Sequence, residues 1–539
     1  MVLVNTIRDA VAQLYQHIDI ITAAAGGGTG GGGNHTNTLI VTTTSTAAAL
    51  LLAYYATRRV SKAQDDPTPI VSYQWPIIGS TMDYFTDPDK FTREKTIQYG
   101  PAFRVHLLGQ YVTVVGGNLA HEVFMNPNLN FVQSSQKFFD IPLFLQHLHN
   151  DLPEHALRDI ISKDMTQKLS TYSRHFEKQT AIVAAQVLGD LREPKIITNV
   201  NELTRAFVAR TTAYTMAGTA ITENKELMHM FEHVADDCMK EILLPNAARS
   251  VLPWWNDLYK RVFYPRNAFV KKSVQKIRDG VKDEVFRRLN DAEHNNSKKQ
   301  DNDDVLGYVL KEYFFSNNSK QGGHIDRDTV LDAITIWFIL MTFTSVLTTS
   351  GTLVGVLYQL AKSPAESISE LRKEQQEQGQ EGPASSYYKR LVKLDSFIRE
   401  SFRYSMKDLA HPHTNVSKEN VVLSNGTVIR PGEEVYTNFW HVNFDKTVQN
   451  DLEDPSEFKP FRFVGRDKQS TKCSADYLMF GLGRHACPGR WFAIEEMKAI
   501  ISTIIHSYDL SLVPADDDDK NSKPALRIIN RESTLENGT

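Results

Sequence analysis

Most of this chain spaces its hydrophobic residues as helices do, and short alternating stretches are few. The block 91–115 predicts a helix followed by two short strands, because its apolar positions change from helical spacing to a period of two. Between about 150 and 330 the pattern is helical and carries no chemical motif. Residues 291–304 and 372–386 are rich in Asn, Asp, Lys, Gln and Glu, and they predict two polar loops.

Two longer apolar segments differ in what they predict. Residues 38–57 carry no charge and are just long enough to cross a bilayer as a helix. Arg58, Arg59 and Lys62 follow, which predicts that the C-terminal side faces the cytosol. A cleaved signal peptide is the alternative, but the segment begins too far into the chain for one. Residues 331–360 are interrupted by Thr and Ser, so we expect a buried helix there.

The N-terminal region has further parts on either side of the segment 38–57. Residues 1–37 predict a lumenal tail, in which the glycine-rich run 26–33 is a flexible spacer. The part before the spacer fits either an amphipathic helix on the membrane surface or a poorly ordered tail. Residues 58–76 are first basic and then rich in proline, and they predict a stiff hinge between the anchor and the globular body.

The composition is that of a large folded protein. Of 539 residues, 41% are hydrophobic and 10% aromatic, which is ample for a sizeable core. The net charge of -4 gives no basic signature of a nucleic-acid-binding protein. The three cysteines, Cys238, Cys473 and Cys487, cannot form a disulfide framework, so we expect the body to face a reducing compartment.

One of these cysteines lies in a setting that suits a haem-thiolate ligand. Cys487 lies between Gly483 and Gly489, which let the backbone approach a flat macrocycle closely. Pro488 and the helical pattern after it predict a helix N-terminus, whose free N–H groups and dipole favour a thiolate. Phe480, seven positions before the cysteine, is expected to shield the sulfur from water.

Residues 480–489 resemble the Phe-x-x-Gly-x-x-x-Cys-x-Gly signature of the cytochrome P450 superfamily. The position two before the cysteine is commonly Arg, and here it is His485, as in a variant of fungal and plant members. The resemblance implies that His485 donates to a haem propionate, in a pairing that depends on its protonation. For a lone cysteine the simpler interpretation is an inert buried side chain, but the flanking pattern favours the ligand.

Two further motifs strengthen the resemblance. Glu400 and Arg403 lie three residues apart on one helix face and resemble the family's Glu-x-x-Arg pair. Arg462 lies in the segment 458–463, which resembles the family's Phe-x-Pro-x-Arg-Phe meander, and the resemblance implies a buried network of the three charges. An ordinary surface ion pair would be the interpretation of Glu400 and Arg403 alone. Three motifs in the right order favour the network.

The resemblance implies the cytochrome P450 fold, mainly α with small β-sheets, as a single catalytic domain over 77–539. The N-terminal transmembrane helix over 38–57 would precede it. The cofactor would be haem b, iron protoporphyrin IX, with Cys487 as the metal ligand. Arg158 lies where the family's C-helix often supplies a propionate partner, and a solvated helix arginine is the alternative.

The run 331–360 lies where the family has the helix that crosses the distal face of the haem. Residues 343–350 resemble the oxygen-activating stretch of fungal diterpene oxidases, except that Leu347 fills the position of the usual acid or His and cannot relay protons. Thr348 is expected to donate a hydrogen bond to dioxygen, with Thr349 or ordered water supplying the rest. A purely structural bond from Thr348 to a helix carbonyl is the alternative.

The activity implied is that of a monooxygenase, which inserts one oxygen atom from O2 into a C–H bond of a hydrophobic substrate. The region 91–115 resembles sterol 14α-demethylases, so a sterol, terpenoid or related secondary metabolite is the expected substrate. Alternatives are a P450-fold isomerase or peroxygenase that needs no reductase, and a haem-binding membrane protein without turnover.

The expected electron donor is NADPH, acting through a membrane-bound NADPH-cytochrome P450 reductase. The expected basic docking face for this partner comprises Arg484, Arg490 and Lys498, with Lys163 and Lys168. The expected location is the endoplasmic reticulum membrane, crossed once, with the catalytic domain in the cytosol.

Overall fold

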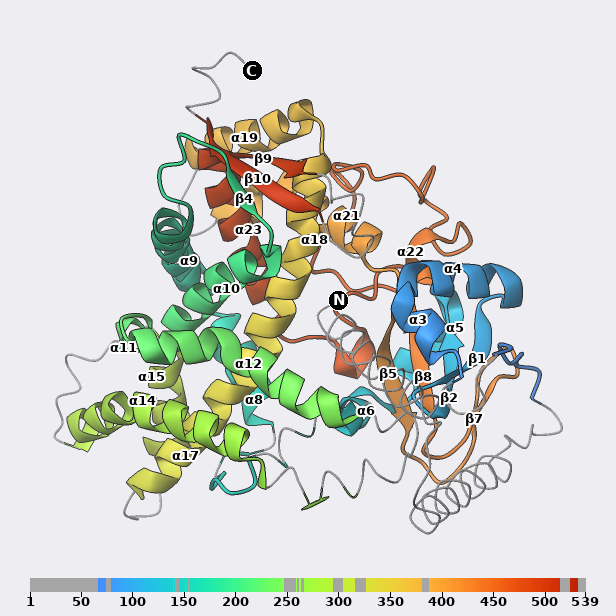
Figure 1. The fold of residues 1–539 in the computed structure, drawn as a ribbon, viewed down its shortest axis with the longest axis horizontal. Helices are drawn as coiled ribbons and strands as arrows, with labels where there is room; N and C mark the ends of the chain where they lie inside the picture. The colour runs from blue at the N-terminus through green and yellow to red at the C-terminus, as the bar shows by residue number, and fades with distance from the viewer. Residues whose placement is uncertain are drawn as a thin grey trace, which may run out of the picture.

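The structure is a computed structural model, and it describes residues 66–531 except 74–78, 139, 141–142, 144, 151, 154, 247–257, 259–260, 263–265, 294–303, 316–325, 381–386 and 514–523. In this part of the chain helices predominate, and Figure 1 shows the longer helices on the left and a β-sheet on the right. The predicted fold class, mainly α with small β-sheets, is therefore confirmed. The predicted anchor over 38–57 lies outside the described residues.

The largest sheet has five strands in the order β1-β2-β8-β5-β3. They are β1 (Ala102–Leu107), β2 (Gln110–Val115), β8 (Glu434–Asn438), β5 (Leu409–Asn415) and β3 (Leu129–Asn130). β1 and β2 are the two strands expected from the sequence, joined as a hairpin. Its turn residues Leu108 and Gly109 both have positive φ, 49° and 75°, as a tight two-residue turn requires.

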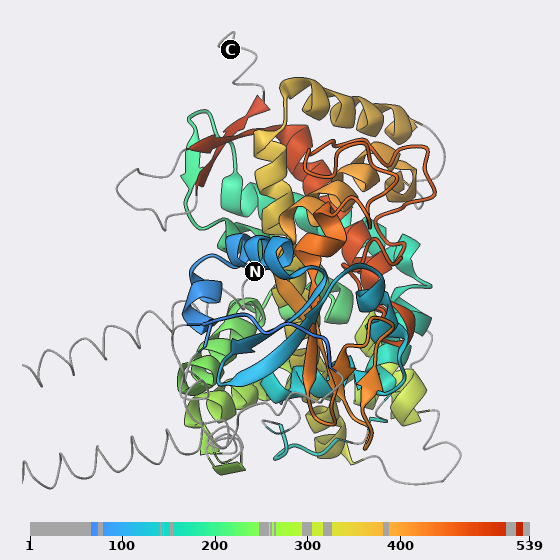
Figure 2. The same ribbon diagram turned by 90° about the vertical axis from the view of Figure 1, so that its right-hand side faces the viewer.

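Every residue of β1 is buried, because both faces of this hairpin are covered. On one face Phe103 and Val105 pack in a cluster with Phe85 of α3 (Thr81–Thr86) and Phe91 of α4 (Pro88–Tyr99). On the other face Ala102 packs in a cluster with residues of α5 (Gly117–Met125). Figure 2 views the molecule from this side and shows the hairpin in front of the helical body.

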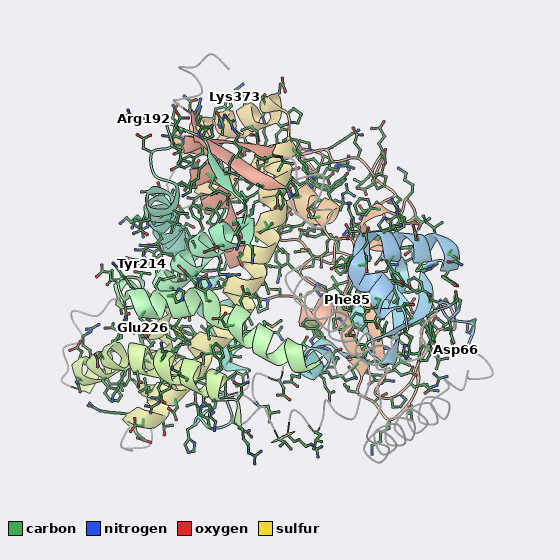
Figure 3. The ribbon with its side chains drawn as sticks, viewed as in Figure 1. Asp66, Phe85, Arg192, Tyr214, Glu226 and Lys373 are labelled. Carbon is green, nitrogen blue, oxygen red and sulfur yellow. The ribbon has the colours of Figure 1, made fainter. Side chains whose placement is uncertain are left out.

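The first described residues are tied to this sheet. Asp66 forms an ion pair of 2.9 Å with Arg104 of β1, and both side chains are buried. The N–H of Val71 donates to the carbonyl of Arg104 at 2.8 Å. Asp66 appears at the sheet side of the molecule in Figure 3. The division of the chain at residue 76 stays a prediction, and these contacts fix the middle of the expected hinge to the body.

The helical body surrounds one long helix, Arg327–Lys362, made of α17 (Arg327–Met341), the π-helical segment η7 (Thr342–Leu347) and α18 (Thr348–Lys362). Within the described residues it alone is long and apolar enough to cross a membrane, but 72% of its most apolar window is buried in the protein. The expectation that the run 331–360 forms a buried helix is confirmed.

Other long helices pack around this one. α9 (Leu169–Val183), α10 (Val200–Ala217) and α23 (Arg490–Ser507) contact one another, and α10 also packs along α18. α12 (Lys225–Asn246) and α14 (Ala268–Glu293) cover the lower part of the body in Figure 1. The apolar faces of these helices meet in the main hydrophobic core.

The other elements complete the body. The helices are α6 (Phe131–Phe138), α8 (Ala156–Asp159), η1 (Ile160–Met165), η2 (Ala184–Leu188), α11 (Thr219–Thr222), α15 (Val305–Val309), η6 (Leu310–Phe315), α19 (Ala365–Gln380), α20 (Tyr387–Arg390), α21 (Val392–Ser405), α22 (Phe439–Phe444) and η9 (Gly483–His485). The strands are β4 (Lys195–Ile197), β9 (Tyr508–Val513) and β10 (Ala525–Asn530) in a three-stranded sheet, and β6 (Val421–Val422) with β7 (Val428–Ile429).

One of the two predicted polar loops is wrong over most of its length. Residues 372–380 belong to helix α19, and residues 381–386 lie outside the described residues. Gln, Glu, Lys and Arg are all strong helix formers, so this polar stretch extends a helix that is anchored by buried Leu371. Most of the other predicted loop, 291–304, lies outside the described residues.

Candidate active site

Cys487 lies in a tight loop just before helix α23. The N–H of Cys487 donates to the carbonyl of Phe480 at 2.8 Å, which closes the loop. Gly483 has a φ of +62°, and a Cβ there would lie 3.1 Å from Sδ of Met125. A Cβ on Gly489 would lie 4.0 Å from Sγ of Cys487. Gly489 therefore leaves the space beside the Cys487 sulfur free of a side chain, and Gly483 allows the loop to pack closely against Met125.

The helix behind the cysteine begins later than the sequence suggested. α23 starts at Arg490 with Gly489 as its N-cap, so Pro488 precedes the helix instead of forming its first turn. The predicted effect on the sulfur remains as an opposing influence: burial raises the pKa of the Cys487 thiol, and the backbone N–H groups of Gly489 and Arg490 act against this rise.

Burial is the larger influence on this thiol, and it raises the pKa of Cys487 above its ordinary value. A buried thiol of this kind ionises when a metal cation takes the place of its proton. The site thus suits a metal ligand better than a free reactive nucleophile. Phe480 is half-buried beside it and stacks edge-on against Phe402, with ring centroids 6.1 Å apart.

His485 lies among positive charges. Nε of Arg484 donates to Nε2 of His485 at 3.0 Å, which leaves Nδ1 of the ring as the N–H donor. Burial, then the charges of Arg484 and Arg158, lower the pKa of His485. The structure therefore brings Arg158 near His485, although 327 residues separate them in the chain (485 - 158). The side chain of Arg158 is exposed, so it is accessible as a partner for a carboxylate.

The sequence analysis missed a further histidine at this site. His413 of β5 is fully buried, and its ring faces that of His485 at 6.1 Å between centroids. Its Nδ1 bonds to the carbonyl of His411 at 2.9 Å, but its Nε2 has no hydrogen-bond partner among the described residues. A bulge in β5 and the positive φ of His411, 48°, turn this part of the strand.

An unsatisfied buried nitrogen is costly unless a ligand meets it. Burial lowers the pKa of His413 to about 3, and the neutral ring carries its proton on Nδ1, so Nε2 donates to a carboxylate only after the ring takes up a second proton, which a facing carboxylate favours. His413, His485 and Arg158 thus form a cradle for carboxylates, and Cys487 lies beside it. These residues fit a haem, whose two propionates would take the cradle and whose iron would take the thiolate.

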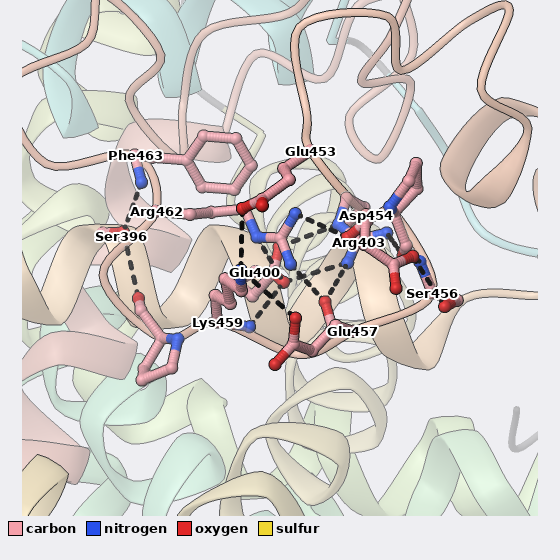
Figure 4. A network of polar contacts seen from close by, with 12 residues as sticks. Ser396, Glu400, Arg403, Glu453, Asp454, Ser456, Glu457, Lys459, Arg462 and Phe463 are labelled. Carbon is pink, nitrogen blue, oxygen red and sulfur yellow. Dashed lines mark hydrogen bonds and ion pairs between the residues drawn. The ribbon is translucent and has the colours of Figure 1, made fainter.

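The charge network predicted from the two other motifs is present. Glu400 accepts from Nε and Nη2 of Arg403 at 2.8 and 2.9 Å, and Nε of Arg462 lies 2.8 Å from the same carboxylate (Figure 4). Arg403 also donates to the carbonyls of Asn443 and Pro455, at 2.6 and 2.7 Å. Glu400 and Arg403 are fully buried, which excludes the surface ion pair. The network fixes the meander loop to helix α21.

On the distal helix the two predicted threonines differ. Thr348 is exposed, and its hydroxyl donates to the carbonyl of Thr344 at 2.8 Å, which is the bond that the structural alternative describes. Its remaining lone pairs are accessible. Thr349 is buried, at 4% exposure, and does not share the open face with Thr348. The predicted part for Thr349 therefore has no support from its position.

Comparisons with known proteins agree with this site. The family model of cytochrome P450 matches residues 69–536. Cytochrome P450 monooxygenase bsc11 of Alternaria brassicicola is 24% identical over 460 residues, covering 80% of this chain and 82% of that protein. Cytochrome P450 monooxygenase 151 of Postia placenta is 24% identical over 486 residues, covering 86% and 91%. The chain belongs to the cytochrome P450 family.

A solved structure supports the same fold. Retinoic acid bound cyanobacterial CYP120A1 has a TM-score of 0.60 and 17% identity to this cytochrome P450, and covers 87% of this chain and 100% of its own. The relatives are named monooxygenases, so the protein is an oxidoreductase that uses O2 and a small-molecule substrate. Membership also implies a haem cofactor, in agreement with the donor set around Cys487.

A buried acid of this P450 escaped the sequence analysis. Glu496 of α23 is fully buried, and its Oε1 accepts from the hydroxyls of Thr211 at 2.6 Å and Thr212 at 2.9 Å. Burial raises the pKa of Glu496 to about 8, so it is mostly protonated at neutral pH. The Thr212 hydroxyl also lies 3.3 Å from Oγ of Ser345 in η7, three residues before Thr348. A chain of hydroxyls therefore connects this acid to the distal helix.

The predicted basic docking face needs a correction. Lys498 is buried, at 5% exposure, because it pairs with Asp395 at 2.9 Å and donates to the carbonyl of Tyr388. It cannot meet a partner protein. Lys163 and Lys168 lie at the surface, each in an ion pair with an aspartate one helical turn away. Arg484 is exposed, and Arg490 is half-buried over the ring of Trp491.

Proposed function

We propose that this P450 is a membrane-anchored haem-thiolate monooxygenase that binds haem b through Cys487 and oxidises a C–H bond of a hydrophobic small molecule. The observation that carries the proposal is the buried Cys487 beside a cradle in which Nε2 of His413 lacks a partner. A thiolate for iron and side chains that bind carboxylates are the two requirements of haem, and His413 binds one as the imidazolium, with Nε2 as the donor.

Bound haem supplies the iron and the electron reservoir at which dioxygen is reduced and the substrate is oxidised. The residues of the chain do the rest. Cys487 gives its negative charge to the metal, and the N–H groups of Gly489 and Arg490 keep that charge stable in a dry place. His413, His485 and Arg158 orient the macrocycle by holding its carboxylates.

Proton supply falls to hydroxyl groups in this chain, because Leu347 cannot carry a proton. Glu496 holds one in the protein interior. Thr212 and Ser345 lie between it and the face on which Thr348 is exposed, and they carry the proton when the Thr212 hydroxyl turns to accept from the acid and donate to Ser345. A water between Ser345 and Thr348 would complete the path. This reserve favours a monooxygenase over a peroxygenase, since activation of O2 consumes protons and use of peroxide does not.

The proposed substrate is a sterol, a terpenoid or a related secondary metabolite. Its support is the resemblance of the region 91–115 to sterol 14α-demethylases and of the distal helix to fungal diterpene oxidases, and the similarity to fungal monooxygenases. The proposed electron source is NADPH through NADPH-cytochrome P450 reductase. The proposed location is the endoplasmic reticulum membrane, crossed once over 38–57, with the catalytic part in the cytosol.

Two measurements on purified protein test the proposal. Cys487→Ser should abolish the red-shifted carbon monoxide band of the reduced protein, because an alcohol lacks the soft anionic donation of a thiolate. A retained band would rule out Cys487 as the ligand. Product formation with reductase and NADPH, against peroxide alone, then distinguishes a monooxygenase from a peroxygenase. Isomerisation without NADPH would exclude both, and a normal carbon monoxide band without any turnover would indicate a haem-binding protein.

A further inference from the structure

Helix α12 carries two histidines and a glutamate on one face, on the helical side of the molecule. His229, Glu232 and His233 are spaced i, i+3 and i+4, so their side chains emerge beside one another. One ligand atom from each lies within 4.8 Å of the others. The two imidazole centroids are 4.5 Å apart, and Nε2 of His233 is 3.7 Å from Oε2 of Glu232. Figure 3 labels Glu226 in the first turn of this helix.

The cluster borders an open pocket of about 530 Å³. His229 and Glu232 line it from α12, and Arg210 and Ala206 line it from α10. None of these residues belongs to the site around Cys487. The pocket leaves room for water or another small ligand beside the cluster, as an ion with three protein ligands requires.

The donor groups of the cluster also suit a metal ion. Glu232 and His233 are both partly buried, and Glu232 also lines the pocket. A partly buried carboxylate is stabilised by a nearby cation, and a neutral imidazole has a free lone pair for one. Two imidazoles one helical turn apart, with a carboxylate between them, are a ligand set that zinc prefers.

We propose that His229, Glu232 and His233 bind one divalent transition-metal ion, of which Zn²⁺ is the best match, at the edge of this pocket. The site is independent of the haem chemistry, so it stands or falls separately from the proposed function.

Arg205 makes a hydrogen bond to His233 that metal binding would break, and this competition offers a second test. Its Nη1 donates to Nδ1 of His233 at 3.1 Å, and its guanidinium pairs with Asp236. With Nδ1 accepting this bond, the neutral ring carries its proton on Nε2, the nitrogen that faces Glu232. A metal bound to Nε2 therefore requires the ring proton to be on Nδ1. Nδ1 can then no longer accept from Arg205, so this hydrogen bond breaks, while the ion pair of Arg205 with Asp236 remains. Removing the arginine should tighten metal binding.

The experiment uses the full-length holoenzyme in detergent, without a histidine tag, dialysed against buffered Zn²⁺. The wild type should hold one Zn²⁺ more per chain than His229→Gln or His233→Gln, whose affinity for this ion should fall roughly tenfold or more. Glu232→Gln should weaken binding without loss of fold, and Arg205→Met should strengthen it. The matched control is His121→Gln, an exposed histidine on α5, which should leave zinc binding unchanged.

Zinc-edge X-ray absorption of the wild type should show two imidazoles and oxygen ligands. Equal zinc content in wild type and His229→Gln/His233→Gln, or a zinc shell of sulfur, would overturn the proposal. Circular dichroism identifies a variant that has merely unfolded. In that case the gain of affinity in Arg205→Met still decides, because a purely structural cluster predicts no gain.

Discussion

The hydroxyl of Thr212 lies 2.9 Å from Oε1 of Glu496, at the centre of the helical body. This relationship joins α10 to the helix that follows the cysteine. No solvent reaches Glu496, so its proton exchanges only through neighbouring hydroxyls or buried water.

The raised pKa of Glu496 predicts a pH-dependent stability. Between its ordinary value of 4.5 and about 8 the folded protein holds a proton that the unfolded chain releases. The stability contributed is therefore complete below about pH 4.5 and is lost as the pH rises through 8. The difference, 8 - 4.5, corresponds to at most about 5 kcal/mol. Glu496→Gln should remove this slope in denaturant titrations, and an unchanged slope would contradict the assignment.

Thr348 and Leu347 predict a particular coupling defect. Thr348→Ala should bind substrate almost normally but form less product per NADPH and release more peroxide, because protons then arrive at the wrong oxygen. Leu347→Asp should not improve coupling, since an unpaired acid in this half-buried position stays mostly protonated. Thr349→Val is the control, because its side chain is buried away from the open face. Normal coupling in Thr348→Ala would assign this threonine a structural part only.

His413 predicts a loss of cofactor affinity. His413→Leu removes the nitrogen that lacks a partner in the protein alone, and a bond from the protonated ring to a propionate would be worth about 1.5–3 kcal/mol. Haem affinity should fall roughly tenfold or more, measured as transfer of haem to apomyoglobin. The exposed His506→Gln serves as the control. Equal transfer rates in the wild type and His413→Leu would exclude the contact.

The buried charge network predicts a large effect on stability. Arg403→Met removes the bidentate partner of the buried Glu400 and leaves it Arg462, and the free energy of unfolding should fall by about 3–5 kcal/mol. Lys459→Met removes an exposed pair with Glu453, 3.2 Å long, and should cost less than about 1 kcal/mol. Chemical denaturation of both variants measures the difference. Similar losses would show that burial of the network contributes little.

Two truncations distinguish the anchor from the body. Removing residues 1–64 should release the protein from membranes with its haem, because Asp66 still pairs with Arg104. Removing residues 1–72 leaves Arg104 buried without this carboxylate and should lower stability by about 3 kcal/mol or more. Haem content and thermal unfolding of the two truncated proteins show whether the body folds without residues 1–64 and whether it needs Asp66. Failure of the first truncation to take up haem would move the domain boundary toward the N-terminus.

Local spacing explains which features could be predicted from the sequence. Glu400 and Arg403 lie on one helical turn, and the loop of Cys487 closes within ten residues, so both follow from neighbouring residues. Helix α19 was missed because its residues are polar, and polarity alone does not separate an exposed helix from a loop.

The remaining errors concern contacts between distant parts of the chain. His413 meets His485 only through the path of β5, although the His-Pro-His run at 411–413 was a visible signal in the sequence. Lys498 was expected at the surface, but its partner Asp395 comes from another helix, about a hundred residues away. Glu496 gave no signal, because an acid in an amphipathic helix is usually solvated.

The ion pair of Asp66 with Arg104 fixes the first described residue to the body, and with the proposed anchor over 38–57 it would limit the distance between the body and a bilayer. If the chain leaves the membrane after residue 57, nine residues reach Asp66, and even fully extended they span about 30 Å. This connecting segment is shorter than the diameter of the globular body. The protein would then work pressed to the lipid surface, taking up and releasing apolar compounds there and meeting its electron donor by sliding in two dimensions.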